Sequence, residues 1–130
     1  MARRLVADVM TREVVYLPGE TTLDEAAQVM RDKAIGDVVV THGPTMAGMV
    51  TDRDIVVRAI AENLPPTSTT LEQIASREMI MVEQAATVEE ALQAMRERGV
   101  RRLLVCDPDR KLVGIISLSD LALLSTSDPA

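Results

Sequence analysis

The sequence predicts an α+β fold of two tandem β-α-β-β-α units that pack about a pseudo-twofold axis. Three observations predict it: an internal duplication, the same order of apolar strands and amphipathic helices in each copy, and one helix-start motif at matching positions. With a shift of 65, residues 6–41 align with residues 71–106, and their apolar patterns match almost throughout. A repeat of this length indicates one structural unit used twice.

The predicted organisation is a first repeat at 5–63, a linker at 64–70, a second repeat at 71–124 and a flexible tail at 125–130. Neither repeat is long enough to bury its apolar surface comfortably alone. We therefore expect the repeats to pack on each other, with paired motifs facing each other across the cleft between them.

Each copy predicts its first helix from a capping box, in which a threonine is followed three residues later by a glutamate. Thr22 and Thr87 are these threonines, and apolar residues follow each of them at helical spacing. The first helix should end near residues 34–36 and the second at Gly99, because glycine favours the left-handed conformation that terminates helices.

Short apolar runs predict three strands in each copy. The expected strands are 14–17, 38–40 and 47–50 in the first copy, and 79–82, 103–106 and 112–116 in the second. Glycine, proline and aspartate between the second and third strands indicate a turn. Residues 5–10 and 71–75 predict short helical turns that lead into the repeats.

The third strand of each copy runs into the same motif. It reads Gly-Met-Val-Thr-Asp-Arg-Asp at 48–54 and Gly-Ile-Ile-Ser-Leu-Ser-Asp at 114–120. The glycine lets the chain come close to another segment, and a hydroxyl residue with an aspartate three positions later indicates a helix start. A helix start can hold an anion through its N–H groups and dipole.

Composition excludes several classes of function. Lys and Arg number 14 against 20 Asp and Glu, and Tyr16 is the only aromatic residue, so nucleic-acid binding is not expected. No apolar run is long enough for a membrane span and no signal sequence is present, which predicts a cytoplasmic protein. The sequence contains one cysteine, Cys106, in an apolar run, where we expect a buried structural thiol rather than a reactive one.

We expect no catalysis and no metal site. The single histidine, His42, lies next to Gly43-Pro44 and is predicted to be a solvated loop residue. One cysteine and one histidine cannot assemble a zinc site within one chain. The sequence has no Walker-type loop and no dinucleotide-binding glycine fingerprint. The aspartate pairs at 52/54 and 107/109 are explained by cap and turn chemistry.

The duplicated unit, the Asp8-Val9-Met10-Thr11 opening, the paired Thr/Ser-x-x-Asp motifs and the string Thr51-Asp52-Arg53-Asp54-Ile55 together resemble a tandem cystathionine β-synthase (CBS) domain pair, or Bateman module. The resemblance covers about residues 5–124. It implies a stand-alone, non-enzymatic regulatory module that binds an adenosyl ligand, such as AMP, ADP, ATP or S-adenosylmethionine, and passes the state to an effector protein. It also implies a homodimer, which the apolar positions Ile55, Val56, Ile60, Leu121 and Leu124 suggest independently.

In the family, each cleft combines the first two strands of one repeat with the Thr/Ser-x-x-Asp motif of the other. Carried over, the resemblance assigns one cleft to Val50, Thr51, Arg53, Asp54, Met79, Ile80, Val100, Arg101 and Arg102. It assigns the other to Val14, Val15, Ile35, Gly36, Asp37, Ile116, Ser117 and Asp120. The aspartate would bind the ribose hydroxyls, and the threonine or serine would lie near the phosphate.

Charge predicts that the two clefts are unequal. The first contains three arginines that could neutralise a di- or triphosphate. The second is expected to have no base beside Ser117 and Asp120, and Asp37 would place a carboxylate where phosphates approach. We therefore predict that the Thr51/Asp54 cleft is the better nucleotide site.

Two alternatives remain open. The hydroxyl–aspartate pairs could be capping boxes only, and the arginines could pair at the surface with Glu97, Asp107 or Asp109. The competing function is a ligand-free dimeric interaction scaffold, or a stress-related protein, whose clefts are closed by side chains such as Met79 and Arg101.

Overall fold

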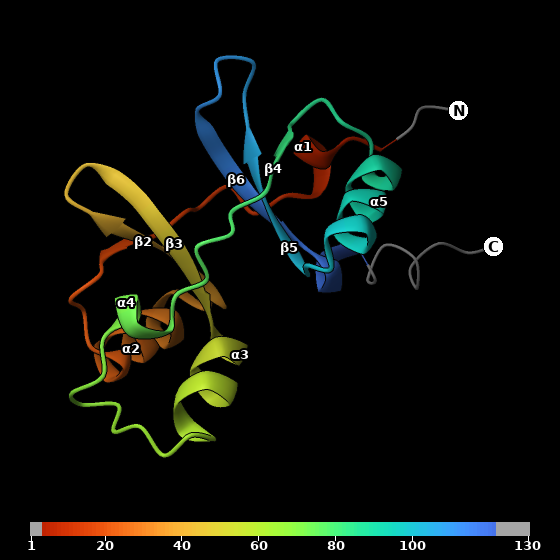
Figure 1. The fold of residues 1–130 in the computed structure, drawn as a ribbon. Coiled ribbons are helices and arrows are strands. Elements are labelled where there is room, and N and C mark those ends of the chain that lie inside the picture. The colour runs from red at the N-terminus through yellow and green to blue at the C-terminus, as the bar shows by residue number, and fades with distance from the viewer. Residues whose placement is uncertain (1–3, 122–130) are drawn as a thin grey trace. The chain divides into compact units, whose positions relative to one another are not determined.

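The structure, a computed structural model, describes residues 4–121, and the predicted order of elements is confirmed there (Figure 1). The first copy contains β1 (Tyr16–Pro18), α2 (Leu23–Lys33), β2 (Asp37–His42), β3 (Thr45–Thr51), α3 (Asp52–Asp54) and the π-helical segment η1 (Ile55–Ile60). The second contains β4 (Met81–Glu83), α5 (Val88–Arg98), β5 (Arg102–Cys106) and β6 (Leu112–Ser117), with a helical turn beginning at residue 118. The short helices α1 (Val6–Val9) and α4 (Leu71–Ile74) lie at the start of the two repeats.

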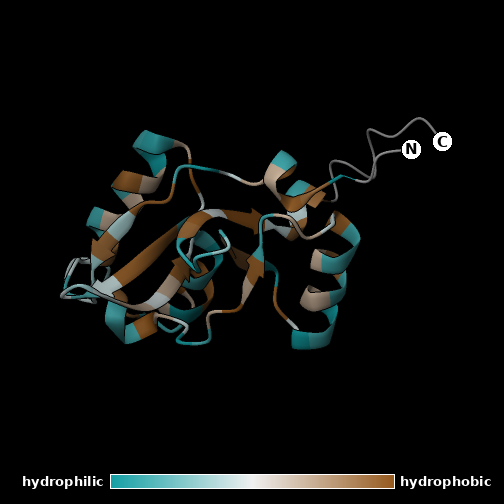
Figure 2. Ribbon diagram, turned by 90° about the horizontal axis from the view of Figure 1, so that it is seen from above, coloured by the Kyte–Doolittle hydropathy of each residue, from teal (hydrophilic) through white to brown (hydrophobic). Residues whose placement is uncertain are grey.

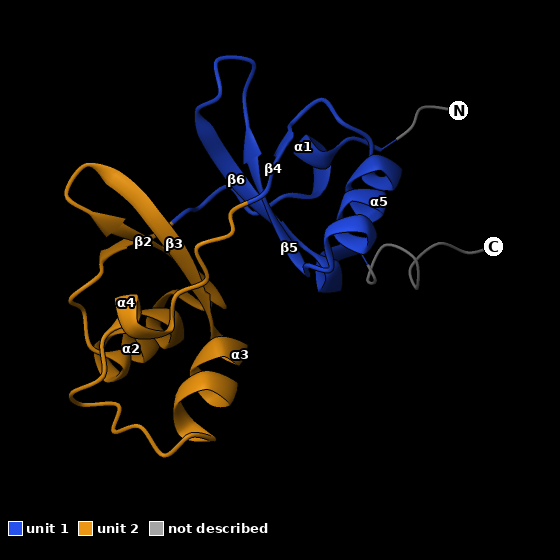
Figure 3. Ribbon diagram, in the orientation of Figure 1, with its two compact units in different colours: residues 1–14, 80–130 blue, residues 15–79 orange. Residues whose placement is uncertain are grey.

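The chain divides into two compact units that do not coincide with the repeats (Figure 3). Unit 2 is residues 15–79, and unit 1 combines residues 1–14 with residues 80–130. The first segment of each repeat therefore belongs to the unit of the other repeat: α1 lies in the unit of the second repeat, and α4 in the unit of the first.

Unit 2 contains a three-stranded sheet in the order β1-β2-β3, with β1 parallel and β3 antiparallel to β2. Its core joins Leu23 and Met30 of α2 to Val38, Val40 and Val50 of the sheet. Helix α2 ends at Ala34, which adopts a left-handed conformation with φ of 54°. The same sheet face is covered by Leu71 and Ile74 of α4.

Unit 1 repeats this topology in the order β4-β5-β6. Its core joins Ala91 and Met95 of α5 to Leu103, Val105 and Ile116, with α1 contributing Val6 and Met10 in the place that α4 takes in unit 2. Helix α5 has the expected Thr87/Glu90 capping box and ends at Gly99, with φ of 64°. The box predicted at Thr22 and Glu25 does not form, because the Thr22 hydroxyl donates to the Asp24 carboxylate instead. Figure 2 shows the strands of both units in the hydrophobic colours.

The predicted close approach at the motif glycines is confirmed in both units. A Cβ atom on Gly48 would lie 2.7 Å from the carbonyl oxygen of Ser76, and one on Gly114 would lie 2.8 Å from that of Thr11. Met49 and Ser76 exchange two backbone hydrogen bonds of 2.9 and 3.0 Å, and Ile115 and Thr11 exchange two of 2.9 and 2.8 Å. The glycines thus allow the segments after α4 and α1 to run along β3 and β6.

The first strand of each copy begins two residues later than predicted, although backbone pairing starts earlier. The carbonyl of Val15 accepts a 2.8 Å hydrogen bond from Val39, and that of Ile80 accepts a 2.9 Å bond from Leu104. Each of these two residues makes one hydrogen bond to the neighbouring parallel strand, and the regular strand pairing begins at the next residue, Tyr16 or Met81.

The apolar residues expected to form a dimer face differ in exposure, and Ile55 is partly buried against the core of unit 2 rather than exposed. Val56 and Ile60 on η1 are 58% and 52% exposed, as expected. Leu121 is 1% exposed and packs in the core of unit 1, so its assignment to an exposed face is wrong. Leu124 lies outside the described residues. Within residues 4–121, no helix is long and apolar enough to cross a membrane.

Candidate ligand-binding site

The end of β3 forms a capping box in unit 2. The Thr51 Oγ1 atom accepts a 3.0 Å hydrogen bond from the N–H of Asp54, and the Asp54 Oδ2 atom accepts a 2.9 Å bond from the N–H of Thr51. The helix start is therefore stabilised by reciprocal bonds, typically by about 0.5–2 kcal/mol for the hydroxyl cap. The cap interpretation is confirmed for this motif.

The end of β6 forms the equivalent pair in unit 1 with longer bonds. The Ser117 Oγ atom accepts a 3.2 Å bond from the N–H of Asp120, and the Asp120 Oδ2 atom accepts a 3.3 Å bond from the N–H of Ser117. The hydroxyl of Ser119 lies 3.1 Å from Ser117 Oγ. A hydroxyl and a carboxylate are thus held side by side at both strand ends.

Capping uses only one carboxylate oxygen of each aspartate. The Asp54 Oδ1 atom lies 3.8 Å from Nε of Arg58, a weak and half-exposed ion pair. Within the described residues, no hydrogen bond or ion pair involves Oδ1 of Asp120. A capping role and a ligand role are therefore compatible, because each carboxylate retains acceptor capacity for a hydroxyl group.

Sheet register places a charged residue opposite each hydroxyl. Asp37 of β2 is paired with Thr51, and Arg102 of β5 is paired with Ser117. The flanking bonds run from Asp52 N–H to the Gly36 carbonyl, and from Leu118 N–H to the Arg101 carbonyl. Directly opposed residues in an antiparallel pair project their side chains from the same face.

These registers contradict one part of the reason for ranking the two motifs, while the pairing of each motif with strands of the other repeat stays a prediction. We expected no base beside Ser117 and Asp120, but Arg102 is the direct strand partner of Ser117. Conversely, the carboxylate of Asp37 accompanies Thr51, not Ser117, within one unit. The expectation failed because antiparallel pairing joins the second and third strands of the same copy, so each motif has its own repeat's second strand as neighbour.

The two helix starts also differ in their backbone donors. The N–H of Arg53 donates to the Asp52 carboxylate at 2.8 Å, so a side chain of the protein occupies that donor. The residue equivalent to Asp52 is Leu118, whose side chain has no hydrogen-bond acceptor. No partner for the N–H of Ser119 occurs in the described part of the chain. The start after β6 therefore has more capacity for an anion.

The remaining predicted residues are distributed over both units. Of the cleft assigned to Thr51 and Asp54, unit 2 holds Val50, Thr51, Arg53, Asp54 and Met79, and unit 1 holds Ile80, Val100, Arg101 and Arg102. Of the other, unit 1 holds Val14, Ile116, Ser117 and Asp120, and unit 2 holds Val15, Ile35, Gly36 and Asp37. Each hydroxyl–aspartate motif lies within one unit, and its combination with residues of the other unit stays a prediction.

The structure also tests the predictions made for residues outside the proposed clefts. Cys106 is buried and free, as expected. Asp107 accepts backbone hydrogen bonds from Asp109 and Lys111, which confirms its turn role. His42 is the last residue of β2 rather than a loop residue, although it is exposed. No cluster of three or more potential metal ligands occurs among residues 4–121.

Arg58 is a neighbour of the first motif that sequence reasoning missed. Its NH1 atom donates to the carbonyl of Ile74 at 3.1 Å, which holds the guanidinium near Asp54. The spacing of four residues between Asp54 and Arg58 was the available signal, since such pairs meet on one helix face.

Comparison with known proteins identifies the same family in both repeats. A family model described as CBS domain matches residues 6–60 and again residues 71–126. The CBS domain-containing protein YhcV of Bacillus subtilis is 33% identical over 123 residues, covering 95% of this chain and 86% of that protein. Hypoxic response protein 1 of Mycobacterium tuberculosis is 35% identical over 116 residues, covering 88% and 80%. The chain spans 60% of a third relative, the uncharacterized protein MK0525 of Methanopyrus kandleri, at 32% identity.

Solved structures share the fold. An uncharacterized conserved protein from Pyrococcus horikoshii has a TM-score of 0.84 at 27% identity, with 100% of this chain and 98% of that chain covered. A structure of hypoxic response protein I with two coordinated zinc ions has a TM-score of 0.69 at 34% identity, covering 95% and 99%. The CBS domain pair of protein MJ0100, in complex with 5′-methylthioadenosine and S-adenosyl-L-methionine, has a TM-score of 0.80 at 23% identity, covering 96% and 98%.

Proposed function

We propose that this chain, which belongs to the CBS domain family, is a non-enzymatic regulatory module that binds an adenosyl ligand and passes its state to a partner protein. The observation that carries the proposal is the matched pair of helix starts, each with a hydroxyl and a partly available carboxylate at the end of a buried strand. The complex of the MJ0100 pair with two adenosyl compounds supports the ligand class.

The chemistry of the half-sites suits a ribose. An ionised carboxylate accepts charge-assisted hydrogen bonds from vicinal hydroxyls, and Oδ1 of Asp120 has capacity for them. Apolar residues from the predicted set, such as Met79 and Val100, would enclose the adenine by burial and dispersion, since no aromatic residue other than Tyr16 exists to stack on it.

We place the phosphate-binding half at Ser117 and Asp120, in reverse of the ranking by sequence. Arg102 is paired with Ser117, and Arg101 precedes it, so two guanidinium groups accompany one aspartate there. Around Thr51, the carboxylates of Asp37, Asp52 and Asp54 outnumber the guanidinium groups of Arg53 and Arg58. A polyphosphate is therefore repelled less at the Ser117/Asp120 half than at the Thr51/Asp54 half.

Signal transfer would follow from differential affinity. A ligand that binds one conformation of the pair more tightly shifts the population toward it, and a partner protein then recognises that conformation. The exposed side chains of Val56, Val57 and Ile60 on η1 give unit 2 an apolar face that suits a homodimer contact. The module and its effector would thus be coupled through packing rather than chemistry.

Titration calorimetry with adenosine, AMP, ADP, ATP and S-adenosylmethionine tests the proposal on the full chain. Asp120→Asn should weaken the tightest ligand by about 10–150-fold, the equivalent of one charge-assisted hydrogen bond of about 1.5–3 kcal/mol. Asparagine keeps an acceptor for the cap, so the helix start is preserved. Asp54→Asn tests the other half in the same way.

Asp8→Asn is the matched control. Asp8 accepts a 3.0 Å bond from the N–H of Leu5 and so caps α1 as Asp54 and Asp120 cap their helices, but it belongs to neither proposed cleft. Ligand affinity should be unchanged in this variant. Equal losses in all three variants would show that capping, and not ligand contact, is what the carboxylates provide.

A scaffold function is the competing possibility, favoured by the apolar face of η1. Thermal unfolding separates the two, because a ligand at 100 times its Kd should stabilise the chain by about 2.7 kcal/mol. A flat response to all five compounds, together with a stable dimer in sedimentation, would establish the scaffold and remove the sensor. Release of phosphate or adenine from any compound would contradict the non-enzymatic proposal.

A further inference from the structure

A pocket lies within unit 2, away from the helix start that follows β3. It is a pocket of about 490 Å³ between the β2–β3 hairpin, α4 and the segment after α4. The pocket is lined by Thr45 and Ala47 at the beginning of β3, whereas Thr51 ends that strand. None of its lining residues belongs to either proposed adenosyl cleft, so the pocket does not depend on that proposal.

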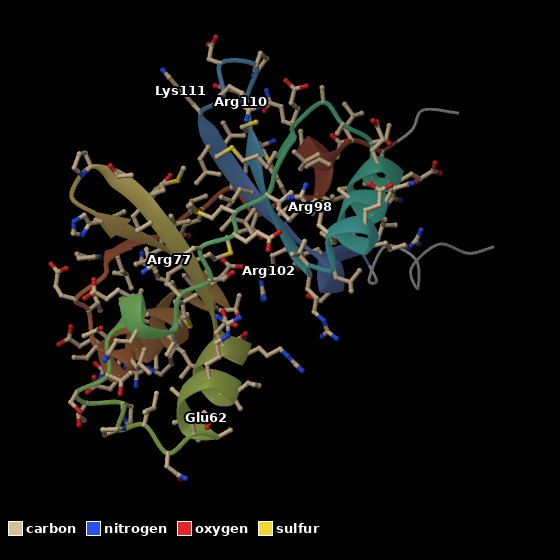
Figure 4. All side chains as sticks on the ribbon, viewed as in Figure 1. Glu62, Arg77, Arg98, Arg102, Arg110 and Lys111 are labelled. Atoms are coloured by element: carbon tan, nitrogen blue, oxygen red, sulfur yellow. The ribbon has the colours of Figure 1, made fainter. Side chains whose placement is uncertain are left out.

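The pocket contains one charged group of each sign. Glu72 of α4 and Arg77 of the following segment both line it, and Figure 4 labels Arg77 beside β3. Neither side chain makes a hydrogen bond or ion pair with any described residue. Opposite charges that share a pocket without pairing are both available to a ligand.

The position of the Glu72 carboxylate is defined by Gly19. A Cβ atom on Gly19 would lie 2.9 Å from Oε2 and 3.2 Å from Cβ of Glu72, so the glutamate side chain folds over the glycine. The same glycine ties three elements together, because its N–H donates to Thr41 at 2.9 Å and its carbonyl accepts from Glu72 at 3.0 Å. The Glu72 carboxylate therefore lies against a backbone segment that two hydrogen bonds hold in place.

Two hydroxyl groups and the imidazole of His42 supply the remaining polar side chains of the lining. The Thr41 Oγ1 atom donates to the Leu17 carbonyl at 3.4 Å, which leaves its acceptor capacity available, and Thr45 adds a second hydroxyl. Val40, Ala47 and Ala75 contribute apolar atoms to the lining. A pocket with a few convergent polar groups on an apolar base is the usual form of a small-molecule site.

We propose that this pocket binds a small zwitterion of the α-amino acid class, with its carboxylate on Arg77 and its ammonium group on Glu72. A guanidinium recognises a carboxylate by two parallel hydrogen bonds, and a carboxylate accepts from an ammonium group. A nucleotide or other polyanion is disfavoured because it would meet Glu72, and a simple cation would meet Arg77. A zwitterion satisfies both charges at once.

Nuclear magnetic resonance of the full chain against the twenty standard L-amino acids tests the proposal. At ~10 mM, an amino acid with a Kd of about 1 mM or tighter should shift the amide signals of Gly19, Thr45 and Arg77. The N-acetyl derivative and the amide of the same amino acid each lack one charge and should bind about two- to fivefold more weakly, because each loses one charge contact with an exposed side chain. Absence of shifts with every amino acid would overturn the proposal.

Variants locate the site. Arg77→Gln and Glu72→Gln should each lower the affinity about two- to fivefold, whereas Arg96→Gln and Glu89→Gln on the exposed surface of α5 should leave it unchanged. Gly19→Ala should cause a smaller loss, since the new methyl group displaces the Glu72 carboxylate without backbone strain. Equal binding of the N-acetyl derivative, or shifts confined to the residues around Thr51 and Ser117, would contradict the assignment.

Discussion

The ends of β3 and β6 have the same fold but different electrostatics. Both strands deliver a hydroxyl and an aspartate to a helix start, and both lie beside a segment that comes from the other copy. Beside Thr51 the strand partner is Asp37, and beside Ser117 it is Arg102. Duplication therefore preserved the architecture of the half-site while the neighbouring charges diverged, which is how one fold can hold two unequal sites.

The largest effect should come from the feature that the two ends share. Gly48→Ala and Gly114→Ala should each lower the free energy of unfolding by about 1–3 kcal/mol, because the new methyl group meets a backbone carbonyl that cannot move aside. Urea denaturation measures this. Gly19→Ala is the control, since its methyl group would meet the Glu72 side chain and no backbone atom. A lower free energy of unfolding in only one of the two variants, Gly48→Ala or Gly114→Ala, would contradict the structural equivalence of the ends of β3 and β6.

The next effect should separate the two ends. Arg102→Gln should weaken ATP binding by about tenfold, or about 1.4 kcal/mol, while leaving adenosine unaffected, because the guanidinium acts on phosphate and not on ribose. Arg102→Lys keeps the charge and should recover part of the affinity. Calorimetry with both ligands measures the difference.

An equal loss of ATP and adenosine in Arg102→Gln would mean that the arginine supports the fold of the half-site. A loss of ATP binding in Arg53→Gln with none in Arg102→Gln would restore the ranking by sequence, in which the Thr51 end holds the phosphate.

The order of elements could be predicted from the sequence because each depends on neighbours a few residues away. The capping box at Thr87 and the helix end at Gly99 are examples, and the close approach at Gly48 followed from a glycine in an apolar strand. Local patterns of capping and turns carry this information within the segment itself.

The charge environment could not be predicted in the same way. It depends on which residues the hairpin places opposite each other, and Asp37 and Thr51 are paired only because a bulge after Val40 shifts the register by one residue. Burial of Leu121 was missed because its partners, Val6 and Met10, come from the opposite end of the chain. The pocket at Arg77 was missed for the same reason: Glu72 and Arg77 reach β2 only through the exchange of leading segments.

A smaller effect should appear where the two first helices end. Ala34 and Gly99 are equivalent positions, and both adopt a left-handed conformation, with φ of 54° and 64°. Gly99→Ala should cost about 1 kcal/mol, because a side chain is disfavoured there. Ala34→Gly should stabilise the chain by about 0.5 kcal/mol, since relief of this strain exceeds the entropy that glycine adds to the unfolded state.

Urea midpoints of the two variants measure these changes. Opposite signs would confirm that the same backbone conformation ends both helices. Destabilisation by Ala34→Gly would instead show that the methyl group of Ala34 contributes packing that outweighs its strain.

The smallest effect should come from exchanging the exposed residues that follow the two hydroxyls. Arg53 and Ser119 are equivalent and exposed, so a charge there is largely screened by solvent and salt. The double variant Arg53→Ser/Ser119→Arg should change ATP affinity by less than about threefold and should respond to ionic strength more than the wild type does. If the exchange instead moved tight ATP binding from one end to the other, as judged by combining it with Asp54→Asn and Asp120→Asn, an exposed charge would set the preference. Because Arg102 is half-buried in the sheet and Ser119 is not, we expect the strand residue to dominate.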